Sequence, residues 1–132
     1  SLRYADHIVS TLNFAYQNVF NNNGRTKKTI GNLGTHYGLF CGLLERMLNE
    51  KSSIFDEPKK LLHKEISALT KDLQINNFSV EEKKWFKKGF TTGLKKYLNK
   101  EKPMMNVNHF LRDHGIEFSI SKDDFLKGGG EE

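Results

Sequence analysis

Residues 30–42 read IGNLGTHYGLFCG, and glycine recurs there at intervals of three, four and four residues. These intervals return to one face of an α-helix, which has about 3.6 residues per turn. Each glycine inside a helix costs roughly 0.8–1 kcal/mol relative to alanine, so the stripe lowers local helix stability by on the order of 3–4 kcal/mol. We infer that another helix, a ligand or a phosphate approaches the backbone closely here. The stripe consists of Gly31, Gly34, Gly38 and Gly42.

A continuous apolar face runs along the same segment, which predicts a helix over residues 29–50 with one side in the protein core. The glycine stripe lies on a flank of this face. A neighbouring helix would cross at such a flank, so the position favours packing within the domain. If the stripe faced solvent instead, it would offer a surface to a partner protein, and the sequence leaves this alternative open.

Apolar residues at helical spacing predict further helices over residues 4–20, 57–73, 80–100 and 106–114. Signals at the helix ends support these ranges. Asp56 is placed to cap the start of the helix at 57–73, and Ser79 and Glu82 match a capping box at the start of the helix at 80–100. Asn106 is a candidate N-cap of the last helix, and Gly115 is placed to end it.

The sequence therefore predicts an all-α fold, a compact bundle of four longer helices with a short C-terminal helix. After the last helix, the alternating apolar residues Ile116, Phe118 and Ile120 predict an extended arm. We expect one helical domain over residues 1–127 and a flexible tail over residues 128–132.

Residues 38–43, GLFCGL, resemble residues 89–94, GFTTGL. A duplicated helical hairpin would explain the similarity. However, the glycines flank the apolar face on one side in the first segment and on the opposite side in the second. We therefore interpret the segments as two helices that each carry a strip of small residues, where backbones can approach.

Two features bound the environment of the protein. Cys41 is the only cysteine, so the chain cannot form an internal disulfide, and a reducing compartment is expected. No segment has the ~18 uninterrupted apolar residues of a membrane span, and the first residues do not resemble a signal peptide. The sequence thus predicts a cytoplasmic protein that does not enter a membrane.

Positive charge is concentrated in one segment. Residues 81–102 contain eight lysines and three acidic residues, an excess of five positive charges that equals the formal net charge of the whole chain. A lysine-rich helix of this kind suits phosphates, an acidic protein partner, or solvent alone. We favour nucleic acid bound without sequence preference, because the helix lacks the arginines that read base edges.

On a helical projection, three lysines point away from the apolar face and two flank it, with the single tryptophan among them. Lysine ammonium groups neutralise phosphates, and an aromatic ring can stack on bases. The candidate nucleic-acid-binding residues are Lys84, Lys88 and Lys95 on the outer side, Lys87 and Lys96 on its flanks, and Trp85.

The chain carries no recognisable catalytic or cofactor motif. Its glycines are spaced for a helix and do not form the glycine-rich loop that binds nucleotides. His109 and Asp113 can share a helix face, but two such groups do not make a metal site. We therefore expect a non-catalytic protein without a metal or cofactor, acting as a nucleic-acid-binding protein or as a small helical subunit of a nucleoprotein assembly.

A second hypothesis is a protein-interaction module, such as an adaptor, chaperone or regulator. It would use the glycine-striped helix 29–50 to dock a partner helix and the arm 116–120 to add a strand to a partner sheet. Either hypothesis is compatible with an oligomer or a larger complex.

Overall fold

The computed structural model of the chain describes residues 2–48, 56–73, 75–96, 105–113, 115–117, 119–121 and 123–124. Every regular element in this part of the chain is helical, which confirms the all-α fold predicted from the sequence. The elements are α1 (Leu2–Gln17), the π-helical turn η1 (Asn18–Asn22), α2 (Lys27–Leu48), α3 (Asp56–Leu73), the 3₁₀ turn η3 (Ile75–Asn77), α4 (Val80–Leu94) and α5 (Met105–Asp113).

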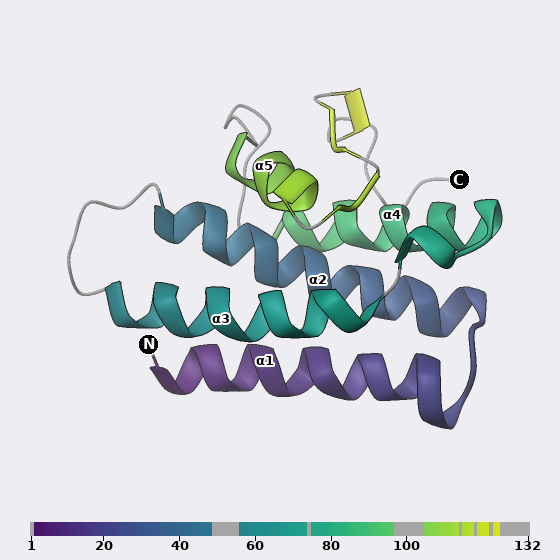
Figure 1. Cartoon of the computed structure of the whole chain (residues 1–132), viewed down its shortest axis with the longest axis horizontal. Coiled ribbons are helices and arrows are strands. Elements are labelled where there is room, and N and C mark those ends of the chain that lie inside the picture. Colours follow the sequence, from purple (N-terminus) through teal and green to yellow (C-terminus); the bar gives the residue numbers. More distant parts are fainter. Residues whose placement is uncertain are drawn as a thin grey trace.

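Helix α2 lies at the centre of the bundle (Figure 1). It contacts α1, α3, α4 and α5. Successive long helices alternate in direction, so α2 and α4 run parallel to each other. Helix α5 and the segment that follows it lie on the upper side of the view, over α2 and α4.

The core is built around aromatic rings from α2 and α4. Tyr37, Phe40, Phe86 and Phe90 are among the largest fully buried side chains. The ring centre of Phe86 lies 5.8 Å from that of Tyr37 and 6.2 Å from those of Phe78 and Phe90. Tilted and offset contacts at these distances suit the charge distribution of aromatic rings, and their burial supplies much of the hydrophobic stabilisation.

The start of α2 differs from the prediction. The helix begins at Lys27 rather than at residue 29, because Thr26 and Thr29 bind each other's free amides. The amide of Thr29 donates to Oγ1 of Thr26 (3.1 Å), and the amide of Thr26 donates to Oγ1 of Thr29 (2.9 Å). Residues 49 and 50, the predicted end of this helix, lie outside the described residues.

Three other predicted helix boundaries also need correction. Helix α3 begins at Asp56, which is therefore its first residue and not its N-cap. The first helix leaves α geometry at Gln17 and continues as the η1 turn before Gly24, which has a φ of +84°. Helix α4 ends at Leu94, earlier than predicted, as the amide of Lys96 turns back to the carbonyl of Gly93 (3.1 Å). Residues 97–100 of the predicted helix lie outside the part of the chain that the structure describes.

Helix α5 begins at Met105, so Asn106 lies inside the helix and is not its N-cap. The predicted stop at Gly115 is confirmed. Gly115 has a φ of +72°, and the amide of Ile116 donates to the carbonyl of Leu111 (2.9 Å), as in a Schellman motif. Glycine suits this position because other side chains rarely adopt a positive φ.

The buried side chain of Glu45 accepts a hydrogen bond at the start of α5. Glu45 of α2 is only 2% exposed and accepts a hydrogen bond from the amide of Val107 at 2.8 Å. The first amides of a helix lack partners within the helix, and an anion there is stabilising. The sequence pattern does not reveal this role of Glu45, because an acid on an amphipathic helix ordinarily points to solvent.

The closest contact in the bundle joins the backbones of α2 and α4. Gly34 and Gly38 of α2 face the carbonyl oxygens of Phe86 and Phe90, and a methyl group on either glycine would lie well under 3.0 Å from these oxygens. Only a Cα–H group fits in this space. Contacts of this type between helices add weak Cα–H···O attraction to the packing.

The second strip of small residues completes the same contact. Gly89 and Gly93 of α4 face the carbonyl oxygens of Gly31 and Thr35 of α2, again without room for a methyl group. The two strips that the sequence showed separately thus pack against each other. Gly31 itself is less constrained, since a methyl group there would lie 4.0 Å from the nearest neighbouring atom, the carbonyl oxygen of Trp85. Gly42 is buried further along α2.

We expect alanine at Gly38 or Gly93 to destabilise the protein. Each methyl group would force the helices apart, and overpacking of this kind costs about 1–3 kcal/mol, more than the ~1 kcal/mol gained in helix propensity. Gly31→Ala is the matched control in the same helix, because it has room for the methyl group and should be neutral or stabilising. Urea unfolding measures all three variants. A Gly38→Ala variant as stable as the wild type would contradict the close contact.

Candidate nucleic-acid interface

The lysine-rich helix α4 starts with the capping box that the sequence predicted. The amide of Glu82 donates to Oγ of Ser79 (3.1 Å), and the amide of Ser79 donates to Oε1 of Glu82 (2.8 Å). Two amides that would lack partners are thereby satisfied. The capping box fixes where α4 begins and therefore which of its side chains face the core.

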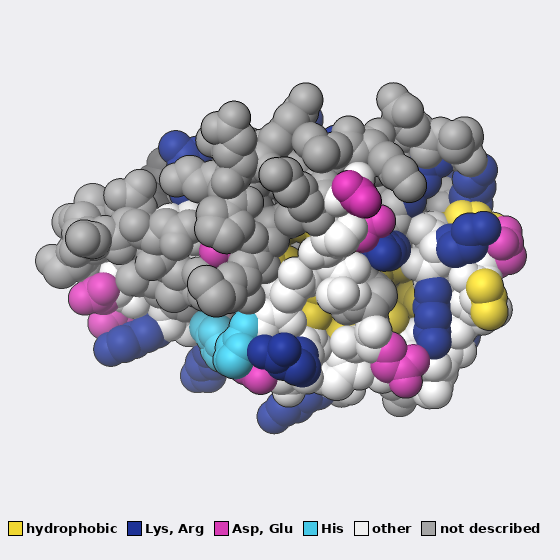
Figure 2. Space-filling view, turned by 90° about the horizontal axis from the view of Figure 1, so that it is seen from above, with side chains coloured by type: hydrophobic (Ala, Val, Ile, Leu, Met, Phe, Trp, Pro, Cys, Tyr) yellow, Lys and Arg dark blue, Asp and Glu magenta, His cyan; other side chains and the backbone are white. Residues whose placement is uncertain are grey.

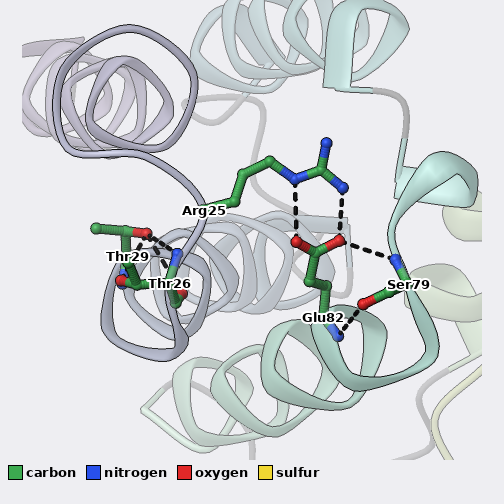
Figure 3. A network of polar contacts seen from close by, with 5 residues as sticks. All are labelled: Arg25, Thr26, Thr29, Ser79 and Glu82. Atoms are coloured by element: carbon green, nitrogen blue, oxygen red, sulfur yellow. Dashed lines mark hydrogen bonds and ion pairs between the residues drawn. The ribbon is translucent and has the colours of Figure 1, made fainter.

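Arg25 connects this capping box to the loop before α2 (Figure 3). Its guanidinium donates to both carboxylate oxygens of Glu82, from Nε at 3.1 Å and from Nη2 at 2.5 Å. It also lies over the ring of Phe78, with 5.1 Å between Cζ and the ring centre. A two-pronged contact of this kind is geometrically specific, so it holds the starts of α2 and α4 together.

The contacts of Glu82 lower the pKa of its carboxyl group below the ordinary value. The hydrogen bond from Arg25 is the largest cause, followed by that from the amide of Ser79. Both stabilise the charged form, and together they outweigh the small effect of burial. The start of α4 thus depends on an ionised Glu82.

The structure separates the candidate lysines by direction. Lys87 points to the segment after α5, where its ammonium group lies 3.3 Å from the carboxylate of Asp124. Lys83 points the same way and lies 3.3 Å from Glu117. Lys87 is therefore part of an ion pair within the chain, on the side of α4 that faces the segment after α5.

The remaining candidates lie away from the core side of α4. Lys84 is exposed and lies 3.8 Å from Glu81 of the same helix, whereas Lys88 and Lys95 are half-buried. Lys96 is exposed just after the helix ends. Trp85 is half-buried and packs partly against the core, and its backbone lies beside Gly31 at the α2–α4 contact.

The predicted arm is extended but forms no strand in its described residues. Ile116 and Ile120 are buried in the core. The side-chain amide of Asn108 binds both backbone groups of Ile120, accepting from its amide (2.8 Å) and donating to its carbonyl (2.9 Å). The side-chain amide of Asn76 likewise donates to the carbonyl of Gly115 and accepts from the amide of Glu117. These backbone groups are thus already engaged within the chain.

A short helical turn at residues 123–124 follows the arm. Its Asp124 accepts hydrogen bonds from the amide (3.0 Å) and hydroxyl (2.9 Å) of Ser121. Burial alone would raise the pKa of the Asp124 carboxyl, but the hydrogen bonds from Ser121 and Lys87 hold it below its ordinary value. Asp124 is therefore ionised, and it is held beside α4 next to Lys87.

Cys41, His36 and His109 lie in separate places in the structure. Cys41 is buried, which raises the pKa of its thiol far above the ordinary range, with nearby Glu45 adding to the effect. His36 is half-buried, and burial lowers its pKa. His109 lies 3.2 Å from Asp113 on the exposed side of α5. Among the described residues, no group of three or more His, Cys, Asp or Glu side chains is placed to hold a metal ion.

The surface seen in Figure 2 carries both signs of charge. Lysine and arginine side chains lie beside aspartate and glutamate, most clearly toward one end of the molecule. In the part of the chain that is described, no helix is both long enough and apolar enough to cross a membrane. None of the known protein families matches the chain, and no curated protein sequence or solved structure is significantly similar to it.

We expect Glu82 to make the stability of the protein depend on pH below its ordinary pKa of 4.5. Its pKa is lower in the folded state, so the stabilisation is fully present above about pH 4.5 and is lost as the pH falls through the folded value. Glu82→Gln removes the titrating group and should flatten this dependence. Urea unfolding at a series of pH values between about 3 and 6 measures it.

The control for this experiment is Glu57→Gln, which removes an exposed acid from the first turn of α3. Glu82→Gln should flatten the pH dependence more than this control does. An equal flattening in both variants would show that the contact with Arg25 has no special role.

Proposed function

We propose that the protein is a non-catalytic nucleic-acid-binding protein that contacts phosphates through the outer face of α4. The observation that carries the proposal is the alignment of Lys84, Lys88 and Lys95 on the side of α4 opposite its buried aromatic residues. Along the helix axis, Lys84 lies about 6 Å from Lys88, and Lys88 lies about 10 Å from Lys95, given a rise of 1.5 Å per residue. Three ammonium groups in a row suit a chain of phosphates.

The chemistry of this face supports binding without sequence preference. Lysine acts as a point charge toward phosphates, whereas the two-pronged recognition of guanine favours arginine, which α4 lacks. Trp85 adjoins the outer lysines, and its half-buried ring offers a partial surface for stacking a base. Affinity for single or double strands would then come mainly from release of counterions.

The packing of α4 also supports this proposal over the interaction module. Gly34 and Gly38 lie against α4, which leaves them inaccessible to a partner helix in this conformation. The isoleucines of the arm are buried, and several of its backbone groups are bonded to Asn76 and Asn108. The outer lysines, in contrast, lie at exposed or half-buried positions on the side of α4 opposite its buried aromatic residues. An acidic protein partner would use the same lysines and is distinguished by experiment.

We expect binding to random-sequence DNA and RNA that weakens steeply with salt. If three or four lysines each neutralise one phosphate, the slope of log K against log salt is roughly −2 to −4. Trp85 is the only tryptophan, so its fluorescence reports binding directly. Lack of binding to any single- or double-stranded probe at low salt would overturn the proposal. Tighter binding to polyglutamate than to nucleic acid would favour an acidic protein partner.

The matched test compares two triple variants with the same change in net charge. Glutamine at Lys84, Lys88 and Lys95 should make the salt slope less negative by roughly 2–3. Glutamine at the exposed lysines of α3 should leave the slope unchanged; these are Lys60, Lys64 and Lys71. If both triple variants lost affinity and salt dependence equally, net charge alone, and not the face of α4, would determine binding. Circular dichroism establishes that both variants are folded.

A further inference from the structure

The segment after α5 is fixed against the body of the protein by groups that carry no charge. Ile116 and Ile120 are buried. Asn76 binds the backbone on either side of Ile116, and Asn108 binds the backbone of Ile120 itself. These anchors determine where the following residues lie. The position of the segment therefore does not depend on its acidic side chains.

Two carboxylates of this segment meet two lysines of α4. Glu117 lies 3.3 Å from the ammonium group of Lys83, and Asp124 lies 3.3 Å from that of Lys87. Ser121 orients Asp124 through its amide and its hydroxyl. The two contacts are about one helical turn apart on α4, as expected for a segment that follows the helix.

We propose that the carboxylates of Glu117 and Asp124 compete with nucleic acid for Lys83 and Lys87. The inference rests on the proposed function, because it concerns the same helix. The two carboxylates stand where phosphates would lie if the strand also covered this side of α4. They oppose phosphate binding at Lys83 and Lys87 and lower the affinity of the protein for a polyanion.

The competition is expected to be graded. The four side chains are partly exposed, from 32% for Asp124 to 68% for Glu117, so solvent screens both ion pairs. Partly exposed ion pairs of this kind shift an equilibrium by roughly 1.5- to 5-fold each. The segment therefore tunes affinity and the number of phosphates bound, and it does not switch binding off.

The test is the double variant Glu117→Gln/Asp124→Asn in the full chain. Both replacements keep a side-chain oxygen that accepts hydrogen bonds, and neither touches the anchors of the segment. The control is Glu57→Gln/Asp123→Asn, which removes the same charge from two exposed acids, one on α3 and one adjacent to Asp124. Fluorescence titration with a random single-stranded oligonucleotide over a salt series measures affinity and slope for both variants.

We expect the double variant to bind the single-stranded probe more tightly than the control, with a salt slope more negative by roughly 1.4 as two further lysines reach phosphates. Glu117→Gln alone and Asp124→Asn alone should each give about half of this change in salt slope. Equal affinity and slope in the double variant and the control would overturn the inference and leave the proposed function intact. Absence of binding in every protein, including the wild type, would overturn both.

Discussion

The structure depends on the contact between the backbones of α2 and α4. Four glycines on the two helices leave no room for side chains between them, and each faces a carbonyl oxygen of the neighbouring helix. This contact fixes the rotation of α4 about its axis, because only one face of the helix lacks side chains. Phe86 and Phe90 then turn into the core, and the outer lysines lie on the opposite side of the helix, where Lys84 is exposed and Lys88 and Lys95 are half-buried. The candidate interface is thus a consequence of where the glycines lie.

Much of the fold could be predicted from local patterns in the sequence. The capping box at Ser79 and the stop at Gly115 are determined by residues within one helical turn, and both are confirmed. The apolar pattern places the start of α2 at residue 29, because it does not reveal that Thr26 and Thr29 satisfy each other's amides and extend the helix to Lys27. Each glycine strip was visible in the sequence, but periodicity within one helix does not reveal which helix lies opposite.

The candidate site was harder to predict, because its charges are arranged by contacts between distant segments. A helical projection of α4 separates inner from outer lysines, but it does not show that Glu117 and Asp124 approach Lys83 and Lys87. Glu45 illustrates the same limit, since its burial follows from the position of α5 and not from its own neighbours in sequence. The nucleic-acid function itself stays a prediction. Charge and spacing support it, whereas the glycine stripe and the arm are engaged inside the protein.

The parallel direction of α2 and α4 has a consequence for the way in which the chain folds. Parallel neighbours cannot be joined by a short turn, so the chain must pass back along the bundle as α3 before α4 can dock. The glycine contact therefore joins residues that are roughly 50 positions apart in sequence, and closing such a loop costs entropy before any packing energy is gained. Contacts between distant positions slow folding. Docking of α4 is accordingly expected to be a late event in folding, and the lysine-rich face forms only when the rest of the bundle is already in place.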